Sequence, residues 1–431
     1  MLRYFIQKKL FNFFCLFYVF KMFLYSKKTA QALEKYQNKQ LRKLIKLAFK
    51  IPLYQKKYSS LGIKPTDIKT QNDLTKLPIL TKAEYRAWMA EEAKKDIAIK
   101  NFKFTHTSGS TGIPTTNIFP PNEYAHHYML DFFCWIKGGY NPFKGKTLTR
   151  QPGDNSVGTK SLIQKIGFLR RDIFSMQWER DKIIKKINKY KPDFILANSS
   201  ELIYIAQWII NNKINIHKPL FYCPNGENID GLAEKTLKTV YGPGLINAYG
   251  CTEMASFAVK KPGNTVYEII QDAVITMIHT PSNEIKSIGT GNLLITPLYR
   301  QKYPLINYDI GDGVNLEFNQ NGLKQISKIN GRKNDTFIWP SGKQTIYKNL
   351  ENINMNLENI FQIRFIQESY TKIKIQVVKD VNSIKTNEEL ENYLTDLYKD
   401  QFDTDTEIIF DWLPVISPEK NGKIRNMISK I

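Results

Sequence analysis

Cysteine is scarce in this chain of 431 residues, and the four cysteines present lie far apart, at Cys15, Cys134, Cys223 and Cys251. They form neither a CxxC pair nor a dense framework, so the sequence predicts no zinc site and no disulfide scaffold, as suits a reducing cytosol. Internal repeats are also missing, and the composition excludes collagen-like, low-complexity and wholly disordered proteins. With 42% hydrophobic and 24% charged residues, the chain is predicted to be globular, with two or three domains.

Acidic residues are few beside the basic ones, 40 against 62, which gives a formal net charge of +22. A nucleic-acid surface, attraction to anionic lipid, and a genome-wide bias toward Lys, Asn and Ile would each produce this excess. The lysines are spread over the whole chain, whereas a nucleic-acid-binding surface concentrates them. The sequence therefore favours the compositional bias and predicts no nucleic-acid partner.

The N-terminal segment 1–28 is apolar and basic. Its run "LFNFFCLFYVFKMFLY" (10–25) is short for a membrane-spanning helix, which needs about 20 apolar residues, and it contains Asn12 and Lys21. An Ala-x-Ala pattern ending at Ala32 would suit a signal peptide, but Lys21 weakens that interpretation. Two alternatives stay open: a helix that packs on the first domain, or one that lies in the inner-membrane interface with its lysines toward anionic lipid.

The rest of the chain is predicted to be α/β. Apolar residues at three- and four-residue spacing predict a helix that ends at Ile51, before Pro52, and helical periodicity recurs at 180–190 and 200–211. Short β-rich runs lie at 193–198, 291–298 and 372–378. We expect a large N-terminal α/β domain over 29–334, with helix-covered sheets, and a small α+β domain over 335–431.

A loop rich in serine, threonine and glycine, "FTHTSGSTGIPTT" (104–116), is the first motif with chemical content. Gly109 and Gly112 allow sharp turns that bring several amide donors onto one anion, and the neighbouring hydroxyls add further donors. Such a loop suits a polyphosphate, although it lacks the G-K-[ST] ending of the usual P-loop. Taken alone, it is equally well an ordinary surface turn.

Two aromatic and acidic motifs follow, "CPNGENI" (223–229) and "NAYGCTEM" (247–254). Tyr249 offers a flat face for a purine, Gly250 allows a close approach, and Glu253 is a candidate Mg²⁺ ligand. The alternatives are a core aromatic ring and a solvated surface carboxylate.

Three further motifs lie toward the C-terminus. In "YDIGD" (308–312), the Asp312 carboxylate could accept both hydroxyls of a ribose, or it could simply belong to an Asp-Gly turn. "NGRKND" (330–335) is typical of a loop between domains. The ending "KNGKIRNMISKI" places Lys423 in a flexible tail that could bring a cation to a phosphate, or that has no function beyond its charge.

The order of these motifs resembles the adenylate-forming superfamily of acyl-coenzyme A synthetases. Within it, the sequence is most similar to the phenylacetate-coenzyme A ligase branch and its CapK-type proteins of capsular polysaccharide biosynthesis. The segments "IPLYQKKYSSLG" (51–62) and "LTKLPILTKAEYR" (74–86) look like the N-terminal signature of that branch. The resemblance runs from about residue 30 to the C-terminus and implies the adenylate-forming enzyme fold.

The resemblance implies an ATP site built from these motifs. The loop would hold the β- and γ-phosphates through Thr107, Ser108, Gly109, Ser110, Thr111 and Gly112. The adenine would be framed by Gly226, Glu227, Tyr249 and Gly250. Asp312 would bind the ribose, and Arg332 would reach the ribose or the phosphate edge.

Catalytic roles are implied for three residues. Thr252 would approach the α-phosphate, Glu253 would hold Mg²⁺, and Lys423 would stabilise the charge that develops during adenylation. Asp335 would be the hinge about which the small domain rotates between two half-reactions. These assignments make physical sense, because a carboxylate attacking a phosphate brings anions together and must rely on positioning and on nearby cations.

The implied activity is ATP-dependent adenylation of a carboxylic acid that is aromatic, small or glycan-linked, followed by transfer to coenzyme A in surface-polysaccharide biosynthesis. The implied small molecules are ATP, Mg²⁺ and coenzyme A, in a cytoplasmic protein for which attachment to the inner-membrane surface is an open alternative. Transfer to an amine or a sugar hydroxyl without coenzyme A, and an inactive membrane scaffold of the same fold, are the competing hypotheses. The chain departs from the family pattern at Asn228 and at Asn307, where relatives commonly have proline and arginine.

Overall fold

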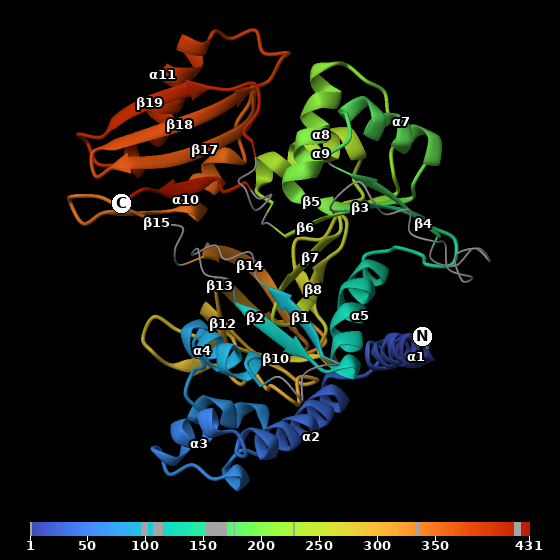
Figure 1. Ribbon diagram of the computed structural model, residues 1–431. Coiled ribbons are helices and arrows are strands. Elements are labelled where there is room, and N and C mark those ends of the chain that lie inside the picture. Colours follow the sequence, from blue (N-terminus) through green and yellow to red (C-terminus); the bar gives the residue numbers. More distant parts are fainter. Residues whose placement is uncertain are drawn as a thin grey trace. The chain divides into compact units, whose positions relative to one another are not determined.

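The computed structural model describes residues 2–95, 102–106, 115–151, 170–175, 177–226, 229–332, 336–417 and 424–431 (Figure 1). Its contacts divide the chain into two compact units. Unit 1 comprises Met1–Gly138 and Ala248–Arg332, and unit 2 comprises Gly139–Asn247 and Lys333–Ile431. Each unit is discontinuous in sequence. The expected boundaries after residues 28 and 334 stay predictions.

Unit 1 begins with helices. They are α1 (Leu2–Tyr25), α2 (Ala30–Ala48), α3 (Pro52–Ser59), η1 (Pro65–Asp67), η2 (Gln71–Lys76), α4 (Lys82–Ala93) and α5 (Pro121–Lys137). The predicted helix break is confirmed: α2 ends before Ile51, and Pro52 starts α3, because proline fits the first turn of a helix. Helix α4 starts with a capping box, in which Thr81 Oγ1 accepts from Glu84 N and the Glu84 carboxylate accepts from Thr81 N.

An eight-stranded sheet forms the body of unit 1, in the order β11-β10-β12-β13-β14-β9-β8-β7. The strands are β7 (Asn247–Cys251), β8 (Ala255–Lys260), β9 (Tyr267–Ile269), β10 (Val274–His279), β11 (Ile285–Lys286), β12 (Gly289–Pro297), β13 (Tyr308–Phe318) and β14 (Lys324–Arg332). A separate hairpin pairs β1 (Lys103–His106) with β2 (Thr116–Phe119). Helix α5 packs against β8, where Asp131 Oδ1 accepts a hydrogen bond from Ser256 N at 2.9 Å.

The first part of unit 2 is a parallel sheet of four strands, in the order β4-β3-β5-β6, with three helices among its described residues. The strands are β3 (Lys146–Gln151), β4 (Arg170–Ser175), β5 (Phe194–Asn198) and β6 (Phe221–Asn225). The helices are α7 (Arg180–Tyr190), α8 (Ser199–Asn211) and α9 (Gly231–Tyr241). An aliphatic core that includes Leu148, Ile195 and Leu237 joins the sheet to these helices.

The second part of unit 2 is α+β. It contains β15 (Thr336–Ile338), β16 (Gln344–Ile346), α10 (Tyr347–Asn354), β17 (Ile360–Ser369), β18 (Lys372–Lys379), α11 (Asn387–Tyr398), η3 (Lys399–Gln401), β19 (Glu407–Trp412) and β20 (Met427–Ser429). Strands β17 and β18 are antiparallel to each other. The outer strand β20 runs parallel to β17, and the outer strand β19 runs parallel to β18. The helices and strands expected at 180–190, 200–211, 193–198, 291–298 and 372–378 are confirmed.

Within unit 2, the C-terminal part meets the start of α9 through a carboxylate and through Leu232, which lies in the C-terminal apolar core. Asp230 caps α9 by accepting from Ala233 N at 2.8 Å through Oδ1. Its Oδ2 accepts from the Tyr347 hydroxyl and from Asn426 Nδ2, both at 2.8 Å. The buried amides of Gln207 and Gln362 add a bond of 3.0 Å. We call Asp230, Tyr347 and Asn426 the α9 latch.

Candidate active site

The turn between β7 and β8 carries two of the predicted catalytic residues. Tyr249 and Gly250 lie in β7, and Thr252 and Glu253 form the turn that follows it. Thr252 is exposed, whereas Glu253 is buried, with 3% of its surface accessible. The turn closes through a hydrogen bond of 3.0 Å from Met254 N to Cys251 O. A tight turn of this kind fixes where the Glu253 carboxylate points.

The carboxylate of Glu253 is held by the tyrosine of the "YDIGD" motif. The Tyr308 hydroxyl donates to Glu253 Oε1 at 2.9 Å, and both side chains are buried. Burial, followed by the nearby charge of Glu253, raises the pKa of Tyr308. Tyr308 is therefore a neutral donor at ordinary pH. The tyrosine of one motif thus holds the carboxylate of another motif that lies more than fifty residues away in the sequence.

Two consecutive residues of unit 1 hold two consecutive carbonyl groups of this turn. Arg300 Nη1 donates to Glu253 O at 2.6 Å, and the Tyr299 hydroxyl donates to Met254 O at 2.8 Å. His127 Nδ1 lies 3.2 Å from the Tyr299 oxygen. Burial, with Arg300 nearby, lowers the pKa of His127 to about 3, so this ring is neutral. Because the Tyr299 proton points to Met254 O, His127 donates to Tyr299 through Nδ1.

Arg300 connects the β7–β8 turn to several other elements of unit 1. Its side chain is completely buried, and its guanidinium lies 4.2 Å from the centroid of the Phe119 ring. Nη2 donates to the Tyr85 hydroxyl at 3.2 Å and to Ile118 O at 3.4 Å. A buried guanidinium with these partners links α4, β2 and the β7–β8 turn. The turn is consequently preorganised by contacts from several elements.

The predicted ribose ligand lies beside the predicted purine face. The Tyr249 hydroxyl donates to Asp312 Oδ2 at 2.9 Å, and the Tyr249 ring packs edge-on against Phe257 and Tyr267. Asp312 does not lie in an Asp-Gly turn: it is within β13, paired in register with Arg332 of β14. The backbone bends just before it at Gly311, which has a φ of +83°.

The structure explains in two different ways why glycine occupies the two predicted adenine-site positions that it describes, Gly226 and Gly250. A Cβ at Gly250 would lie 2.1 Å from Ala255 O, so the close approach of β8 requires glycine there whether or not a purine binds. Gly226, which belongs to unit 2, has a φ of +84°, and a Cβ there would make only an ordinary contact, 4.0 Å from Asn198 Oδ1. Both glycines are thus explained by the backbone, and their contact with adenine stays a prediction.

Other predicted residues lie outside the described residues. These are Thr107, Ser108, Gly109, Ser110, Thr111, Gly112, Glu227, Asp335 and Lys423. For Arg332, the structure describes the backbone within β14. The structure therefore brings together Tyr249, Gly250, Thr252, Glu253 and Asp312 within unit 1. The roles implied for all of these residues stay predictions.

Asn307, the residue at which the resemblance leads us to expect arginine, is held in the core of unit 1. It is completely buried with a φ of +49°, a left-handed conformation that asparagine tolerates better than most residues. Its side-chain Nδ2 donates to Leu74 O at 2.8 Å and to Leu77 O at 3.1 Å. Asn307 therefore fastens η2 to the start of β13, which gives the asparagine at this position a structural role.

The carboxylate of Glu253 fits the way Mg²⁺ is held in nucleotide sites. Magnesium usually takes one or two protein carboxylates and completes its shell with phosphate oxygens and water. Among the described residues, no group of three or more histidine, cysteine and carboxylate side chains forms a metal cage. The single buried carboxylate of Glu253, fixed by Tyr308, instead matches a magnesium site of one protein carboxylate completed by phosphate oxygens and water.

The supporting residues Arg300, Tyr299, Tyr85 and His127 were missed by sequence reasoning. One signal was present: Arg300 follows directly on the apolar run "NLLITPLY" (292–299), where a charged residue that is buried must find partners. The partners themselves come from distant parts of the chain, with Tyr85 lying 215 positions away from Arg300. No local pattern indicates such a contact.

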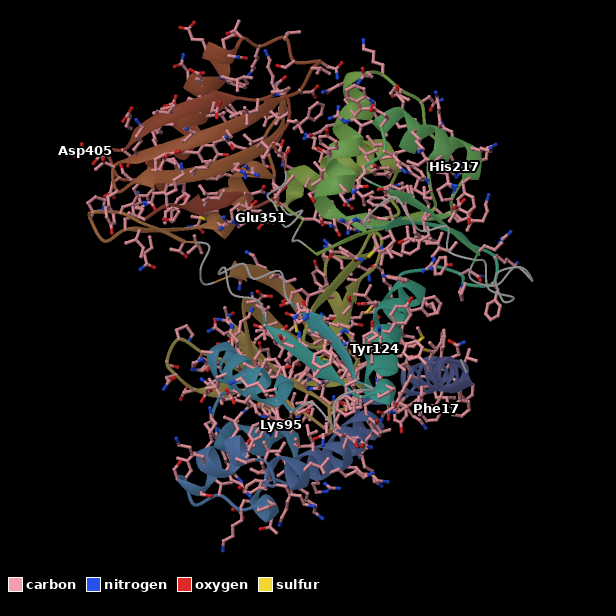
Figure 2. All side chains as sticks on the ribbon, viewed as in Figure 1. Phe17, Lys95, Tyr124, His217, Glu351 and Asp405 are labelled. Atoms are coloured by element: carbon pink, nitrogen blue, oxygen red, sulfur yellow. The ribbon has the colours of Figure 1, made fainter. Side chains whose placement is uncertain are left out.

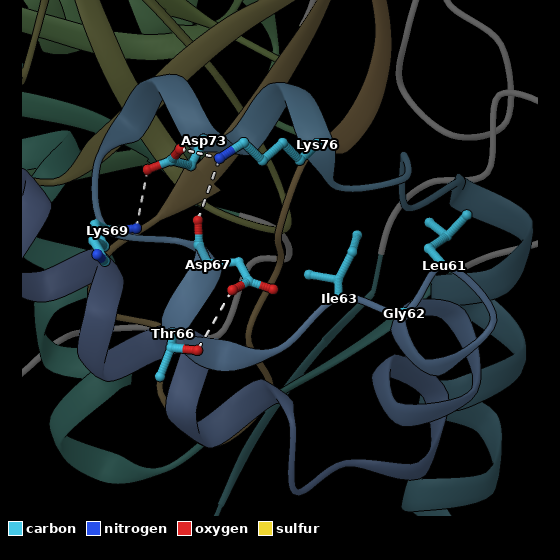
Figure 3. Close-up of a pocket in the computed structure, with 8 residues that line it drawn as sticks. All are labelled: Leu61, Gly62, Ile63, Thr66, Asp67, Lys69, Asp73 and Lys76. Atoms are coloured by element: carbon cyan, nitrogen blue, oxygen red, sulfur yellow. Dashed lines mark hydrogen bonds and ion pairs between the residues drawn. The ribbon is translucent and has the colours of Figure 1, made fainter.

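A surface hollow lies away from these residues, at α3, η1 and η2 (Figure 3). It is lined by Leu61, Gly62, Ile63, Thr66, Asp67, Lys69, Asp73 and Lys76. Asp73 is occupied by hydrogen bonds from Thr70 N, Lys69 N and Lys76 Nζ, which lower the pKa of its carboxyl although burial acts against this. These bonds cap η2, and we assign the hollow no ligand.

The architecture is that of the adenylate-forming ligases. A solved structure of 2-hydroxyisobutyryl-CoA ligase in the postadenylation state matches this chain with a TM-score of 0.74 at 17% sequence identity, covering 94% of this chain and 90% of that one. At this identity the likeness shows the fold. The expected mixed α/β fold class, with a large N-terminal and a small C-terminal domain, is confirmed.

Sequence comparison finds relatives in the branch that the motifs indicate. Residues 337–430 match the family model of the CapK C-terminal domain. The chain is 26% identical over 384 residues to Protein CapK of Staphylococcus aureus, covering 84% of this chain and 81% of that protein. It is 23% identical over 338 residues to phenylacetate-coenzyme A ligase of Pseudomonas putida, covering 72% and 73%. The chain is thus similar over most of its length to Protein CapK and to phenylacetate-coenzyme A ligases, and it has the fold of the adenylate-forming ligases, as its motifs predict.

Proposed function

We propose that this protein adenylates a carboxylic acid with ATP and passes the acyl group to coenzyme A. The observation that carries the proposal is the buried β7–β8 turn, in which Glu253 is fixed by Tyr308 and by the Arg300 bond to its carbonyl group. A preorganised carboxylate next to an exposed threonine suits Mg²⁺ and the α-phosphate of ATP. Relatives that are themselves phenylacetate-coenzyme A ligases support the same chemistry.

The remaining roles belong to the proposal as well. Residues 107–112 hold the β- and γ-phosphates, Glu227 and Tyr249 frame the adenine, and Asp312 binds the ribose, with Arg332 at its edge. Mg²⁺, when bound at Glu253, supplies charge neutralisation for the phosphates. Lys423 stabilises the developing charge during adenylation, and the small domain turns about Asp335 between the half-reactions. Lys423→Ala is expected to abolish adenylation far more than it weakens ATP binding.

The acid is proposed to be aromatic, small or glycan-linked, and the setting to be capsular or surface polysaccharide biosynthesis at the cytoplasmic side of the cell. The similarity to Protein CapK supports this setting. Within the described residues, every helix is too short or too polar to cross a membrane.

A product assay tests the acceptor. Acids that stimulate ATP–pyrophosphate exchange are incubated with ATP, Mg²⁺ and coenzyme A, and the acyl-coenzyme A thioester is sought by mass spectrometry. Thioester formation supports the proposal. Adenylate formation with coenzyme A left unmodified would instead assign the acceptor to an amine or a sugar hydroxyl. Failure of ATP and Mg²⁺ to bind or to raise the thermal stability would assign the chain to an inactive scaffold, since a ligand at 100 times its Kd stabilises by about 2.7 kcal/mol.

A further inference from the structure

Helix α1 presents an apolar stripe to solvent. The stripe consists of large side chains at helical spacing on one face, most of them more than half exposed: Phe13, Leu16, Phe17, Phe20 and Leu24. Phe13, Leu16 and Phe20 have exposed fractions of 63%, 64% and 64%. Large apolar side chains in a contiguous stripe are unusual on a monomer and mark an interaction surface.

The opposite face of α1 packs against the rest of unit 1. It packs on α5, where the Tyr18 ring stacks on His126 with centroids 4.4 Å apart, and Phe11 contacts Tyr124 at 5.8 Å. Met22 is completely buried. Figure 2 shows Phe17 on α1 and Tyr124 on the neighbouring helix α5. The first expected alternative, a helix packed on the body of the protein, is therefore confirmed for this inner face.

Lys21, the one charged residue within the apolar run 10–25, is turned away from the stripe. Its Nζ lies 5.2 Å from the centroid of the Tyr36 ring and 5.7 Å from that of Tyr25, both rings belonging to the inner side. Burial lowers the pKa of Lys21, while the charge of the buried carboxyl of Asp272 opposes this change. Lys21 is thus turned inward, and the alternative in which lysines face anionic lipid stays a prediction for the other lysines of the segment. Its inward position leaves the outer face of α1 without charge between Phe13 and Leu24.

Cations flank the stripe at both ends in the sequence. The first 33 residues contain Arg3, Lys8, Lys9, Lys21, Lys27 and Lys28 and no acidic residue. Lys27 and Lys28 are exposed directly after the helix. An apolar face between cationic ends matches the interface of a bilayer, where acyl chains lie beneath anionic headgroups.

We propose that the stripe of α1 docks on a bilayer containing anionic lipid, with the helix lying in the plane of the interface. This inference goes beyond the proposed chemical function and does not depend on it. A second copy of the chain is a poorer occupant, because pairing of two identical segments would bring together the five flanking cations of each, with no acidic residue in either segment to offset them. The face is fixed by the α5 contacts, so docking requires no unfolding of α1.

The experiment uses the full chain and vesicles of phosphatidylcholine with or without phosphatidylglycerol. Sedimentation measures the bound fraction for the wild type and for Phe17→Ser combined with Phe20→Ser. We expect binding to the anionic vesicles to fall about 10- to 100-fold in the variant, because two phenyl rings no longer enter the acyl region. The matched control, Phe318→Ser with Tyr370→Ser, removes two rings of similar exposure elsewhere and should bind like the wild type.

A second variant tests the charge. Lys27→Gln with Lys28→Gln leaves the stripe intact and should lower anionic-vesicle binding about 10- to 30-fold, with a weaker dependence on salt than the wild type shows. Thermal unfolding of every variant should match that of the wild type, because the substituted side chains are exposed. ATP binding without vesicles should also be unchanged, which separates this test from the test of adenylation.

Several results would overturn the proposal. These are equal binding to both kinds of vesicle, no vesicle binding at all, or no loss in the phenylalanine variant. Light scattering measures the oligomeric state of the wild type and of the Phe17→Ser, Phe20→Ser double variant. A dimeric wild type together with a monomeric variant would assign the stripe to a second copy of the chain instead of to lipid.

Discussion

The β7–β8 turn of unit 1 and the α9 latch of unit 2 are both polar, yet they are built differently. The turn is supported by the completely buried Arg300 together with Tyr299 and Tyr308, which arrive from separate strands and loops. The latch depends on a single oxygen of Asp230, which accepts two side-chain donors. The donors of the latch are only partly buried.

This difference has a functional meaning. Groups held by a buried charge lose much more when one partner is removed than partly exposed groups do, since water replaces the missing partner only in the second case. The turn is therefore suited to keep Glu253 fixed throughout a reaction. For the latch, whose donors are only partly buried, we expect the loss of one donor to cost less, and rotation of the small domain stays part of the proposed function.

Removing Arg300 is the strongest test of this comparison. Arg300→Met leaves the carbonyl groups of Glu253 and Ile118 and the Tyr85 hydroxyl without their buried donor. We expect a loss of about 3 to 5 kcal/mol in the free energy of unfolding, measured by urea denaturation. Arg300→Lys should recover part of it. A loss below about 1 kcal/mol for the methionine variant would contradict the buried-support account.

The attachment of α1 extends the comparison to a third polar contact, with a pH dependence. Burial raises the pKa of Asp272 to about 6, although Lys21 and Lys137 act in the opposite direction. Because the folded protein holds this proton more tightly than the unfolded chain does, the stability from Asp272 is complete below about pH 4 and is lost as pH rises through 6. Relative to Asp272→Asn, the wild type should lose about 2 kcal/mol between pH 4 and pH 7. Parallel stability profiles for the two proteins would refute this assignment.

Tyr308→Phe isolates the hydrogen bond to the carboxylate. The substitution removes the donor to Glu253 Oε1 and keeps the ring. A hydrogen bond to a charged group contributes about 1.5 to 3 kcal/mol, so kcat/KM for Mg·ATP should fall about 10- to 100-fold. The fall should appear at limiting Mg²⁺ and shrink when Mg²⁺ is raised, because Tyr308 positions the metal ligand. An equal loss at every Mg²⁺ concentration would indicate a merely structural role.

Opening the latch should have the smallest effect. Tyr347→Phe removes one of the donors to Asp230 Oδ2 and leaves Asn426 in place. We expect about 1 kcal/mol of lost stability and faster hydrogen exchange in β17 and α10, with no change in the β7–β8 turn. Exchange rates that rise equally in both units would show that the latch and the turn belong to one cooperative structure.

The sequence was informative where structure is local. The proline at 52, the periodicity at 180–190 and 200–211, and the β-rich runs predicted real elements, because helix and strand patterns depend on neighbouring residues. The motifs also singled out Glu253 and Asp312, which the structure places in hydrogen bonds with Tyr308 and Tyr249. Their chemical roles follow from the resemblance and stay predictions.

The sequence was uninformative where structure depends on distant partners. Arg300 reaches Tyr85 and Ile118 across the fold, and Asn307 bonds to η2 residues more than 200 positions away. The inward turn of Lys21 depends on Tyr36 and Asp272, which no helical pattern of α1 contains. These features arise from tertiary packing and become visible only in the folded chain.

Acid-dependent ATP–pyrophosphate exchange with Mg²⁺, in the wild type and in Glu253→Gln, tests the central claim most directly. Glu317→Gln, an exposed carboxylate on β13, is the matched control. We predict exchange stimulated by at least one acid from a panel of aryl, hydroxy and amino acids, reduced about 100- to 1000-fold by Glu253→Gln and unchanged by the control. Exchange that survives Glu253→Gln at the wild-type rate would contradict the assignment of this turn to the reaction.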